Sequence, residues 1–174
     1  RKAQDERGEA VVFAYVGLIV WTYTSGAVTR ATQSLVSNAN LVTKVYFPRL
    51  VIPAAAILAT LVDFAIAFSV LMLVMLGFGI VPGVQSIWIV PVPLIILSMT
   101  AMGAGSWLAA LNVQYHDVRH VSPFLVQIWM YASPIVYPLL LVPEAYRPIY
   151  ALNPLAGALA GFRAALLGTP GPTW

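Results

Sequence analysis

Residues 64–116 read FAIAFSVLMLVMLGFGIVPGVQSIWIVPVPLIILSMTAMGAGSWLAALNVQYH, a run of 53 residues without Asp, Glu, Lys or Arg. A membrane-spanning helix needs about 20 mostly apolar residues. The run is therefore long enough for two such helices, provided that the chain turns between them. The segment 77–83, GFGIVPG, supplies the turn because glycine and proline interrupt helices.

The composition of the whole chain favours a membrane protein. Of its 174 residues, 60% are hydrophobic and 9% are charged, whereas a soluble domain has about 45–50% and about 25%. So few charges cannot cover the surface of a soluble enzyme, a disordered tail or a small secreted module, and the chain has no cysteine. Its nine Lys and Arg residues are spread over separate segments, so no nucleic-acid partner is expected.

The apolar pattern predicts an all-α integral membrane protein, a bundle of about four transmembrane helices with a re-entrant helical segment. We expect spans at 11–32, 53–76, 87–111 and 122–141, with Ser122-Pro123 opening the fourth and Pro134 and Pro138 kinking it. Residues 149–167 are apolar but short and are interrupted by Asn153-Pro154. Residues 1–10 are expected to be a polar loop. We interpret 1–174 as one transmembrane domain and as an internal piece of a longer chain.

The orientation follows from the positive charges, since Lys and Arg are enriched in short cytoplasmic loops. The connection 30–52 holds Arg30, Lys44 and Arg49 and no acid, whereas the turn at 77–86 holds no charge at all. This pattern predicts that the 30–52 connection is cytoplasmic and that both ends of the piece lie outside.

The 30–52 connection allows two interpretations. Ser37-Asn38 is a helix-start signal, Pro48 is a stop, and Leu41 and Val45 share a helical face with Tyr46. The segment is either an amphipathic loop on the lipid headgroups or a short cytoplasmic helix that docks into another protein. Tyr, Phe and Arg are favoured at the centres of protein interfaces.

Polar and aromatic groups inside the expected spans are candidates for a translocation path. Asp63 is the one acid within an expected span, and such a group should face the bundle or a wet cavity. It either clamps two helices together or lines a conduit. Tyr131 shares a face with Gln127, and Trp129 lies too deep for an interfacial aromatic belt. Packing between helices is the alternative for these side chains.

A metal-dependent enzyme is the second hypothesis. His116 and His120 are four residues apart, as in a zinc-binding helix, but no third ligand is evident. An intramembrane metalloprotease is therefore kept as the alternative. The chain has no phosphate-binding loop, because neither Lys2 nor Lys44 follows the glycine of a G-K-[ST] motif. If ATP drives this protein, another subunit must hydrolyse it.

Several motifs together resemble one family. The stretch 35–49, LVSNANLVTKVYFPR, is similar to the first cytoplasmic loop of ABC type-2 permeases that export bacterial O-antigen, capsule or teichoic acid. NVQYHDV at 112–118 resembles their second cytoplasmic loop, and SPF at 122–124, QIWMYASPIVY at 127–137 and LNPL at 152–155 follow in the family's order. Members of that family have a further span on each side, six in all, and an N-terminal cytoplasmic helix.

The resemblance implies a transport subunit rather than an enzyme. It implies a homodimer in the bacterial cytoplasmic membrane, a partner ATPase that holds ATP and Mg, and a lipid-linked polysaccharide as cargo. Three sets of functional residues follow. ATPase coupling is assigned to Asn38, Asn40, Lys44, Val45, Tyr46, Phe47, Pro48 and Arg49. The translocation path is assigned to Asp63, Gln127, Trp129, Tyr131 and Tyr137, and an external gate to Glu144, Tyr146, Arg147, Asn153, Pro154 and Arg163.

Overall fold

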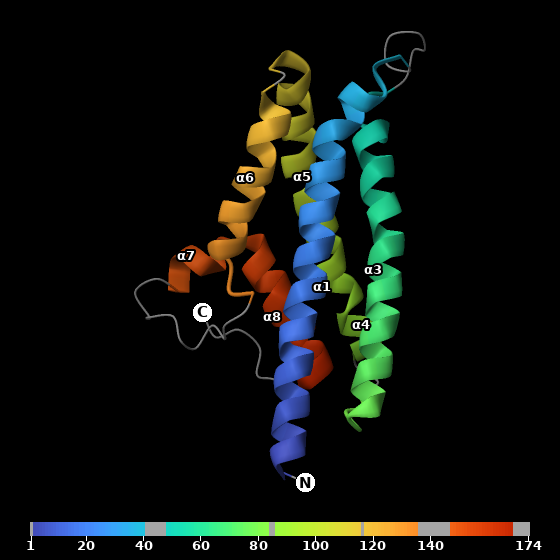
Figure 1. Ribbon diagram of the computed structural model, residues 1–174, viewed down its shortest axis with the longest axis vertical. Helices are drawn as coiled ribbons and strands as arrows, with labels where there is room; N and C mark the ends of the chain where they lie inside the picture. The colour runs from blue at the N-terminus through green and yellow to red at the C-terminus, as the bar shows by residue number, and fades with distance from the viewer. Residues whose placement is uncertain (1, 41–47, 84–85, 116, 136–146, 169–174) are drawn as a thin grey trace.

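The computed structural model describes residues 2–40, 48–83, 86–115, 117–135 and 147–168, and all regular secondary structure in this part of the chain is helical. Three long helices lie side by side, a shorter one leans against them, and two short helices pack beside the half that holds the N-terminus (Figure 1). The helices are α1 (Lys2–Ser37), α3 (Val51–Gly77), α4 (Ser86–Ile89), α5 (Pro91–Gln114), α6 (Val118–Tyr131), α7 (Arg147–Ala151) and α8 (Pro154–Leu167).

Within the described residues, three helical segments are long and apolar enough to cross a membrane. They are Gly8–Ser37, Val51–Gly77 and Pro91–Gln114. The prediction of an all-α membrane fold is thereby confirmed. The expected break at Asn153-Pro154 is also confirmed, because it separates two short helices, α7 and α8.

Two boundary predictions are wrong. Residues 1–10 are not a loop, since α1 begins at Lys2 and runs without a break into the first span. The fourth helix begins at Val118 rather than at Ser122, and it ends at Tyr131 rather than at 141. Its 14 residues are too few for a span. Pro134 therefore lies beyond the helix instead of kinking it, because proline lacks the N–H that would bond to Met130 and its ring clashes with that carbonyl group.

The turn after α3 is built as the sequence predicts. Gly79 has a φ of 75°, a left-handed conformation that glycine adopts without steric cost. Its N–H donates to the Leu76 carbonyl at 3.0 Å, and the Ile80 N–H donates to the Met75 carbonyl at 2.9 Å. This pair of bonds is the Schellman motif, and it satisfies carbonyl groups that the end of a helix otherwise leaves unpaired.

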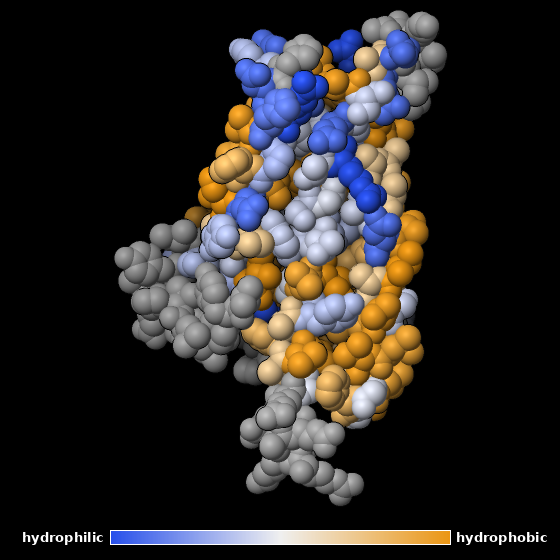
Figure 2. All heavy atoms as spheres, viewed as in Figure 1, coloured by the Kyte–Doolittle hydropathy of each residue, from blue (hydrophilic) through white to orange (hydrophobic). Residues whose placement is uncertain are grey.

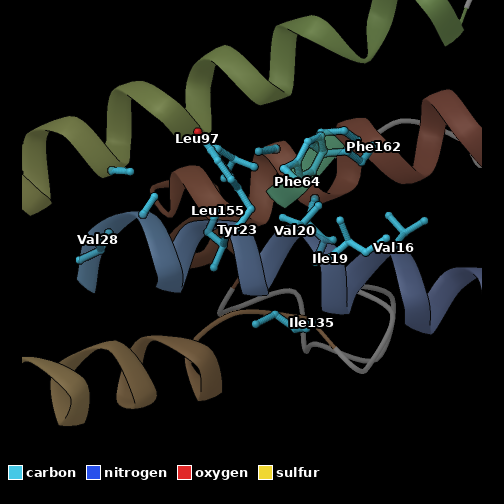
Figure 3. Packing of buried hydrophobic residues seen from close by; sticks show 14 of the residues in the cluster. Val16, Ile19, Val20, Tyr23, Val28, Phe64, Leu97, Ile135, Leu155 and Phe162 are labelled. Atoms are coloured by element: carbon cyan, nitrogen blue, oxygen red, sulfur yellow. The ribbon is translucent and has the colours of Figure 1, made fainter. Parts of the chain in front are cut away.

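The core lies between α1, α3, α5 and α8, and α3 contributes Ile57, Phe64, Leu71 and Met75 to it. Val16, Val20 and Tyr23 of α1 face Leu97 and Phe162 in this cluster (Figure 3). The α1 and α5 backbones approach closely where Gly105 meets Ala31. A Cβ atom at Gly105 would lie 2.6 Å from the Ala31 Cβ. Small residues allow such contacts, as is common between membrane helices.

The outer face of α3 is strongly apolar and exposed, and it carries Leu58, Val62, Ile66, Leu73 and Leu76. The hydrophobic surface over α3 is visible at the right of Figure 2. Exposed aliphatic residues on a spanning helix are matched to lipid tails.

Candidate functional site

A polar stripe on α1 interrupts this apolar surface. Thr22, Ser25, Thr29 and Gln33 follow one another at spacings of three and four residues, so they share one helical face. Thr22 and Gln33 are exposed, and Ser25 and Thr29 are half-buried. Figure 2 shows blue and white surface over α1 and α6 in the half that carries the 38–50 connection. This side of the bundle does not suit lipid tails.

An ion pair lies beside the stripe. Arg30 of α1 and Asp63 of α3 meet with a nitrogen–oxygen distance of 2.7 Å, and their side chains are 51% and 56% exposed. Both residues lie within helical segments that can span the membrane. Asp63 thus joins two helices, as one of its two expected roles requires, and its half-exposed carboxylate also faces the outside of the single chain. Exposing such charges to lipid is expensive, so this face needs water or another protein surface.

On α6, Gln127 and Tyr131 are both exposed, and Tyr131 is the last residue of the helix with 69% of its surface accessible. In Figure 1, α1 lies between α6 and α3. Gln127 and Tyr131 of α6 and the polar stripe of α1 therefore belong to neighbouring helices. Hydroxyl, amide and aromatic groups together provide hydrogen bonds and flat apolar surfaces.

Trp129 occupies a different environment. Its ring is half-buried against the core, and its Nε1–H donates to the Asn153 Oδ1 at 3.1 Å. The same Oδ1 accepts the Leu155 N–H at 3.1 Å and caps the N-terminus of α8. The Asn153 Nδ2 donates to the Ser133 Oγ at 2.8 Å and to the Ala132 carbonyl at 3.4 Å. Trp129 and Asn153 thus fix the end of α6 against the start of α8.

Arg163 makes a second connection between these elements. Its Nη1 donates to the Pro134 carbonyl at 3.1 Å, and its Nη2 donates to the Ile135 carbonyl at 2.6 Å. The guanidinium carbon lies 3.5 Å from the ring centroid of Phe13, a cation–π contact with α1. Only 6% of the Arg163 surface is exposed. Asn153 and Arg163, both expected at an external gate, are therefore brought together around residues 132–135.

The expected coupling segment lies away from this cluster, at the end of the bundle where α1 ends and α3 begins (Figure 1). Asn38 donates from Nδ2 to the Ser34 carbonyl at 2.8 Å, and Asn40 lies in helical conformation. Pro48 and Arg49 are exposed, and the Pro48 carbonyl accepts the Val51 N–H at 3.0 Å. The 115–117 connection lies at this same end (Figure 1).

Several predicted residues lie outside the described part of the chain. These are Lys44, Val45, Tyr46, Phe47, His116, Tyr137, Glu144 and Tyr146. Arg147 begins α7 and Pro154 begins α8. His120 accepts a hydrogen bond from the Arg119 Nε at 3.0 Å. Among the described residues, no three His, Cys, Asp or Glu side chains are grouped as a metal site would need.

A family model described as ABC-2 type transporter matches residues 2–167. The chain belongs to the ABC-2 type transporter family. Membership in this family of transport proteins supports a membrane-embedded chain and gives no support to a metalloprotease. The long apolar helices of this ABC-2 chain make it a multi-pass membrane protein.

Three curated relatives of this ABC-2 chain share the same protein name. It is 29% identical over 154 residues to the O-antigen export system permease protein RfbA of Myxococcus xanthus. It is 26% and 25% identical, each over 152 residues, to two proteins of the same name from Klebsiella pneumoniae. Each match covers 87% of this chain and 59% of the relative, so the chain spans about three fifths of the length of the relatives that it matches.

The polar stripe of α1 was missed by the sequence interpretation. The signal was present, since Thr22, Ser25, Thr29 and Gln33 recur at helical spacing. It is weak because a serine or threonine hydroxyl can bond to a carbonyl of its own helix. Ser25 does so, donating to the Thr22 carbonyl at 3.3 Å. The sequence alone therefore does not distinguish polar residues that line a path from polar residues whose side chains bond to the backbone of their own helix.

Proposed function

We propose that this chain is the membrane-embedded core of an exporter subunit that moves a lipid-linked polysaccharide outward across the bacterial cytoplasmic membrane. The main support is the set of exposed polar groups on three neighbouring helices, namely the α1 stripe, the Arg30–Asp63 pair of α1 and α3, and Gln127 and Tyr131 of α6. The names of the relatives, which are O-antigen export permeases, support a glycan as cargo.

The chemistry of this face suits a sliding polymer. Hydroxyl and amide groups exchange hydrogen bonds with sugar hydroxyls, and an aromatic ring offers an apolar surface to the face of a sugar. No tight pocket is required, because the cargo must keep moving. An ion pair held between α1 and α3 keeps the charge neutral along the path.

One copy of the chain leaves this polar face open on one side, and a second copy would enclose it. A homodimer is therefore part of the proposal. A separate ATPase subunit that binds ATP and Mg completes it, docked on the end that holds the 38–50 and 115–117 connections. The coupling residues in this proposal are Asn38, Asn40, Pro48 and Arg49, together with Lys44, Val45, Tyr46 and Phe47, which lie outside the described residues.

The decisive experiment reconstitutes the full-length permease with its ATPase in lipid vesicles. A lipid-linked O-antigen glycan is loaded into the leaflet on the ATPase side, and its transfer is followed by access of a lectin on the other side. ATP should drive the transfer, and an ATPase subunit unable to hydrolyse ATP should abolish it. Transfer at the same rate without ATP, or none at all, would refute the proposal.

A further inference from the structure

The helices α4 and α5 together form one rod with a buried side and an exposed side. They join smoothly, because Val90 between them has a helical φ of −56° and ψ of −39° and its N–H donates to the Ser86 carbonyl at 2.9 Å. The buried side is fixed at two points. The Ser86 hydroxyl donates to the Ala165 carbonyl of α8, and Leu97 of α5 lies in the core. The opposite side of the rod is therefore held in a fixed direction, away from the bundle.

Two tryptophans mark the ends of the exposed side of this rod. Trp88 of α4 is 80% exposed, and Trp107 of α5 is 65% exposed. Between them, Val92, Ile95 and Met99 are exposed and follow Trp88 at spacings of four, three and four residues. The rod contains no Asp, Glu, Lys or Arg. Its exposed side is thus aromatic at both ends and aliphatic between them, an order that matches a bilayer from one headgroup layer to the other.

The separation of the tryptophans matches the thickness of a bilayer. Their positions, 88 and 107, differ by 19 residues, which corresponds to about 28 Å at the rise of an α-helix. The hydrocarbon core of a bilayer is about 30 Å thick, and Trp is enriched at both of its boundaries. An interface with another protein would instead place its aromatic anchors near the centre, where this surface carries Met99. The spacing therefore favours lipid over a second protein surface.

Contacts between α1 and α5 transfer the depth of the tryptophans to α1. The Tyr23 hydroxyl bonds to the Ser98 Oγ at 2.7 Å, and these residues are 75 positions apart. Ala31 lies against Gly105 with nearly the same offset, so the two helices run parallel in one register. A shift of 75 positions places the depths of the two tryptophans near residues 13 and 32 of α1.

The charges of α1 support the same two boundaries independently. Five of the six charged residues in this helix precede residue 13, and they are Lys2, Asp5, Glu6, Arg7 and Glu9. Between residues 13 and 32, Arg30 is the one charged residue, and it is paired with Asp63 at 2.7 Å. Charged side chains are costly within the hydrocarbon layer. The nearly charge-free part of α1 and the part of the rod between the tryptophans therefore define the same layer.

We propose that the exposed side of α4 and α5 is a lipid-contact surface that sets the depth of the bundle in the bilayer. Trp107 lies in the headgroup layer on the side of the 38–50 connection, and Trp88 lies in the opposite headgroup layer. About three turns at the start of α1 then stand in water, and the Arg30–Asp63 pair lies within the hydrocarbon layer. The proposal does not depend on the cargo, because it concerns how the chain sits in lipid.

The test measures depth in lipid vesicles that contain the full-length permease and nitroxide-labelled lipids. The chain itself has no cysteine, and any cysteines outside it are replaced by serine. Single cysteines are placed at exposed positions and carry a small fluorescent label, namely Ile89→Cys, Met99→Cys and Ala110→Cys on the rod and Glu9→Cys on α1. Both tryptophans remain in place. Quenching by nitroxides in the headgroup or along the acyl chain gives the distance of each label from the bilayer centre.

The helical rise predicts the depth of each label, because the bilayer centre should lie midway between the tryptophans. Met99→Cys should report about 2 Å from the centre, Ile89→Cys about 13 Å and Ala110→Cys about 19 Å. From the register of α1 with α5, Glu9→Cys should report about 20 Å. The fourth value tests the proposal on a helix that carries neither tryptophan.

A matched pair of arginine variants tests the same surface without a label. Met99→Arg places a charge at the bilayer centre, whereas Trp107→Arg places it among the headgroups, where the long side chain reaches phosphate groups. The amount of membrane-inserted permease should fall about tenfold for Met99→Arg and stay near the wild-type level for Trp107→Arg. Met99→Leu is the control for loss of the methionine, and it should insert normally.

Three results would overturn the lipid-contact surface. The first is a Met99→Cys label that acyl-chain nitroxides do not quench and that cross-links to a second copy, which would make the surface a protein interface. The second is a set of depths in which Met99→Cys is not the deepest position. The third is equal insertion of Met99→Arg and Trp107→Arg. None of these measurements uses glycan or ATP, so a failure here is distinct from a failure of the proposed export function.

Discussion

At the scale of single residues, the position of Tyr131 separates a conduit role from a packing role. The side chain is 69% exposed at the end of α6, so removing it should not open a cavity in the core. We expect Tyr131→Ala to lower glycan export about two- to tenfold, the range that a lost aromatic contact gives. Tyr131→Phe should retain most export, because the ring rather than the hydroxyl is the working part.

Dimer yield and surface glycan, measured on the same Tyr131→Ala cells, provide the check. A fall in export with normal assembly supports the conduit role. If assembly is lost in step with export, Tyr131 packs between protein surfaces in the complete exporter, and the conduit role is wrong.

Arg30 and Asp63 provide a second prediction at this scale. Either Arg30→Met or Asp63→Asn leaves one charge unpaired within a spanning helix. We expect the double variant to be less destabilised than the sum of the two single variants, with a coupling of about 0.5–2 kcal/mol. Thermal unfolding of the purified permease in detergent measures it. Both side chains are about half exposed, which favours the lower end of this range.

Asp117→Asn combined with Arg30→Met serves as the reference cycle, because Asp117 makes no ion pair with Arg30. The effects of that pair should add. An equal coupling in both cycles would mean that the 2.7 Å contact contributes nothing specific.

The same pair shows what the sequence can and cannot predict. It predicts that Asp63 needs a partner, because an unpaired acid is costly inside a membrane. It does not identify Arg30, since the sequence interpretation counted that cation in the 30–52 connection, at the very end of the expected span 11–32. The structure extends the helix to Ser37, which places Arg30 at the depth of Asp63. The sequence does not identify the partners of Arg163 either. They are the carbonyls of Pro134 and Ile135, which are free to accept its hydrogen bonds only because α6 ends at Tyr131.

At the scale of elements, the sequence predicts that the long helices are present more reliably than it predicts where each helix ends. The turn after α3 and the break before α8 follow from local glycine, proline and asparagine chemistry. The end of α6 depends on tertiary contacts. A proline at 134 is compatible with either a kink or a stop. The stop is favoured because Asn153 and Arg163 satisfy the carbonyls that the chain then exposes.

The contact between α1 and α5 gives a prediction for a pair of elements. Gly105→Ala places a Cβ atom 2.6 Å from the Ala31 Cβ, so the helices must separate. We expect a loss of stability of about 1–3 kcal/mol, the usual cost of overpacking. Denaturant or thermal unfolding in detergent measures it.

Two controls isolate the steric cause. Gly103→Ala lies on the same helix and meets nothing within 4 Å, so it should be neutral or slightly stabilising. Adding Ala31→Gly to Gly105→Ala should restore most of the lost stability. The steric explanation fails if the double variant is no better than Gly105→Ala alone.

At the scale of the whole molecule, the two ends of the bundle have separate tasks. The end with the 38–50 and 115–117 connections is the proposed docking site for the ATPase. Replacing Tyr46 or Phe47 by Ala should remove an anchor worth about 1–3 kcal/mol at an interface centre. Co-purification of the ATPase and glycan export should both fall, while the permease still inserts and dimerises. Normal export by both variants would contradict the docking assignment.

The orientation of the bundle determines which end can face the ATPase. Arg30, Lys44 and Arg49 lie in or next to the 38–50 connection, and the turn at 78–83 carries no charge. Cations are retained on the cytoplasmic side, so α1 should run from outside to inside, α3 should return, and the 78–83 turn should face outward. The two connections lie at opposite ends of α3, and the bundle can therefore be oriented with one reporter at each end.

Gly83→Cys and Arg49→Cys are suitable reporters, because both positions are exposed and a Cβ atom at Gly83 meets nothing within 4 Å. In intact cells, a membrane-impermeant maleimide should label Gly83→Cys and leave Arg49→Cys unmodified. Inverted membrane vesicles should show the reverse. Labelling of Arg49→Cys in intact cells, with Gly83→Cys protected, would invert the topology. The ATPase would then have to dock beside α4, and the assignment of residues 38–50 to coupling would fall with it.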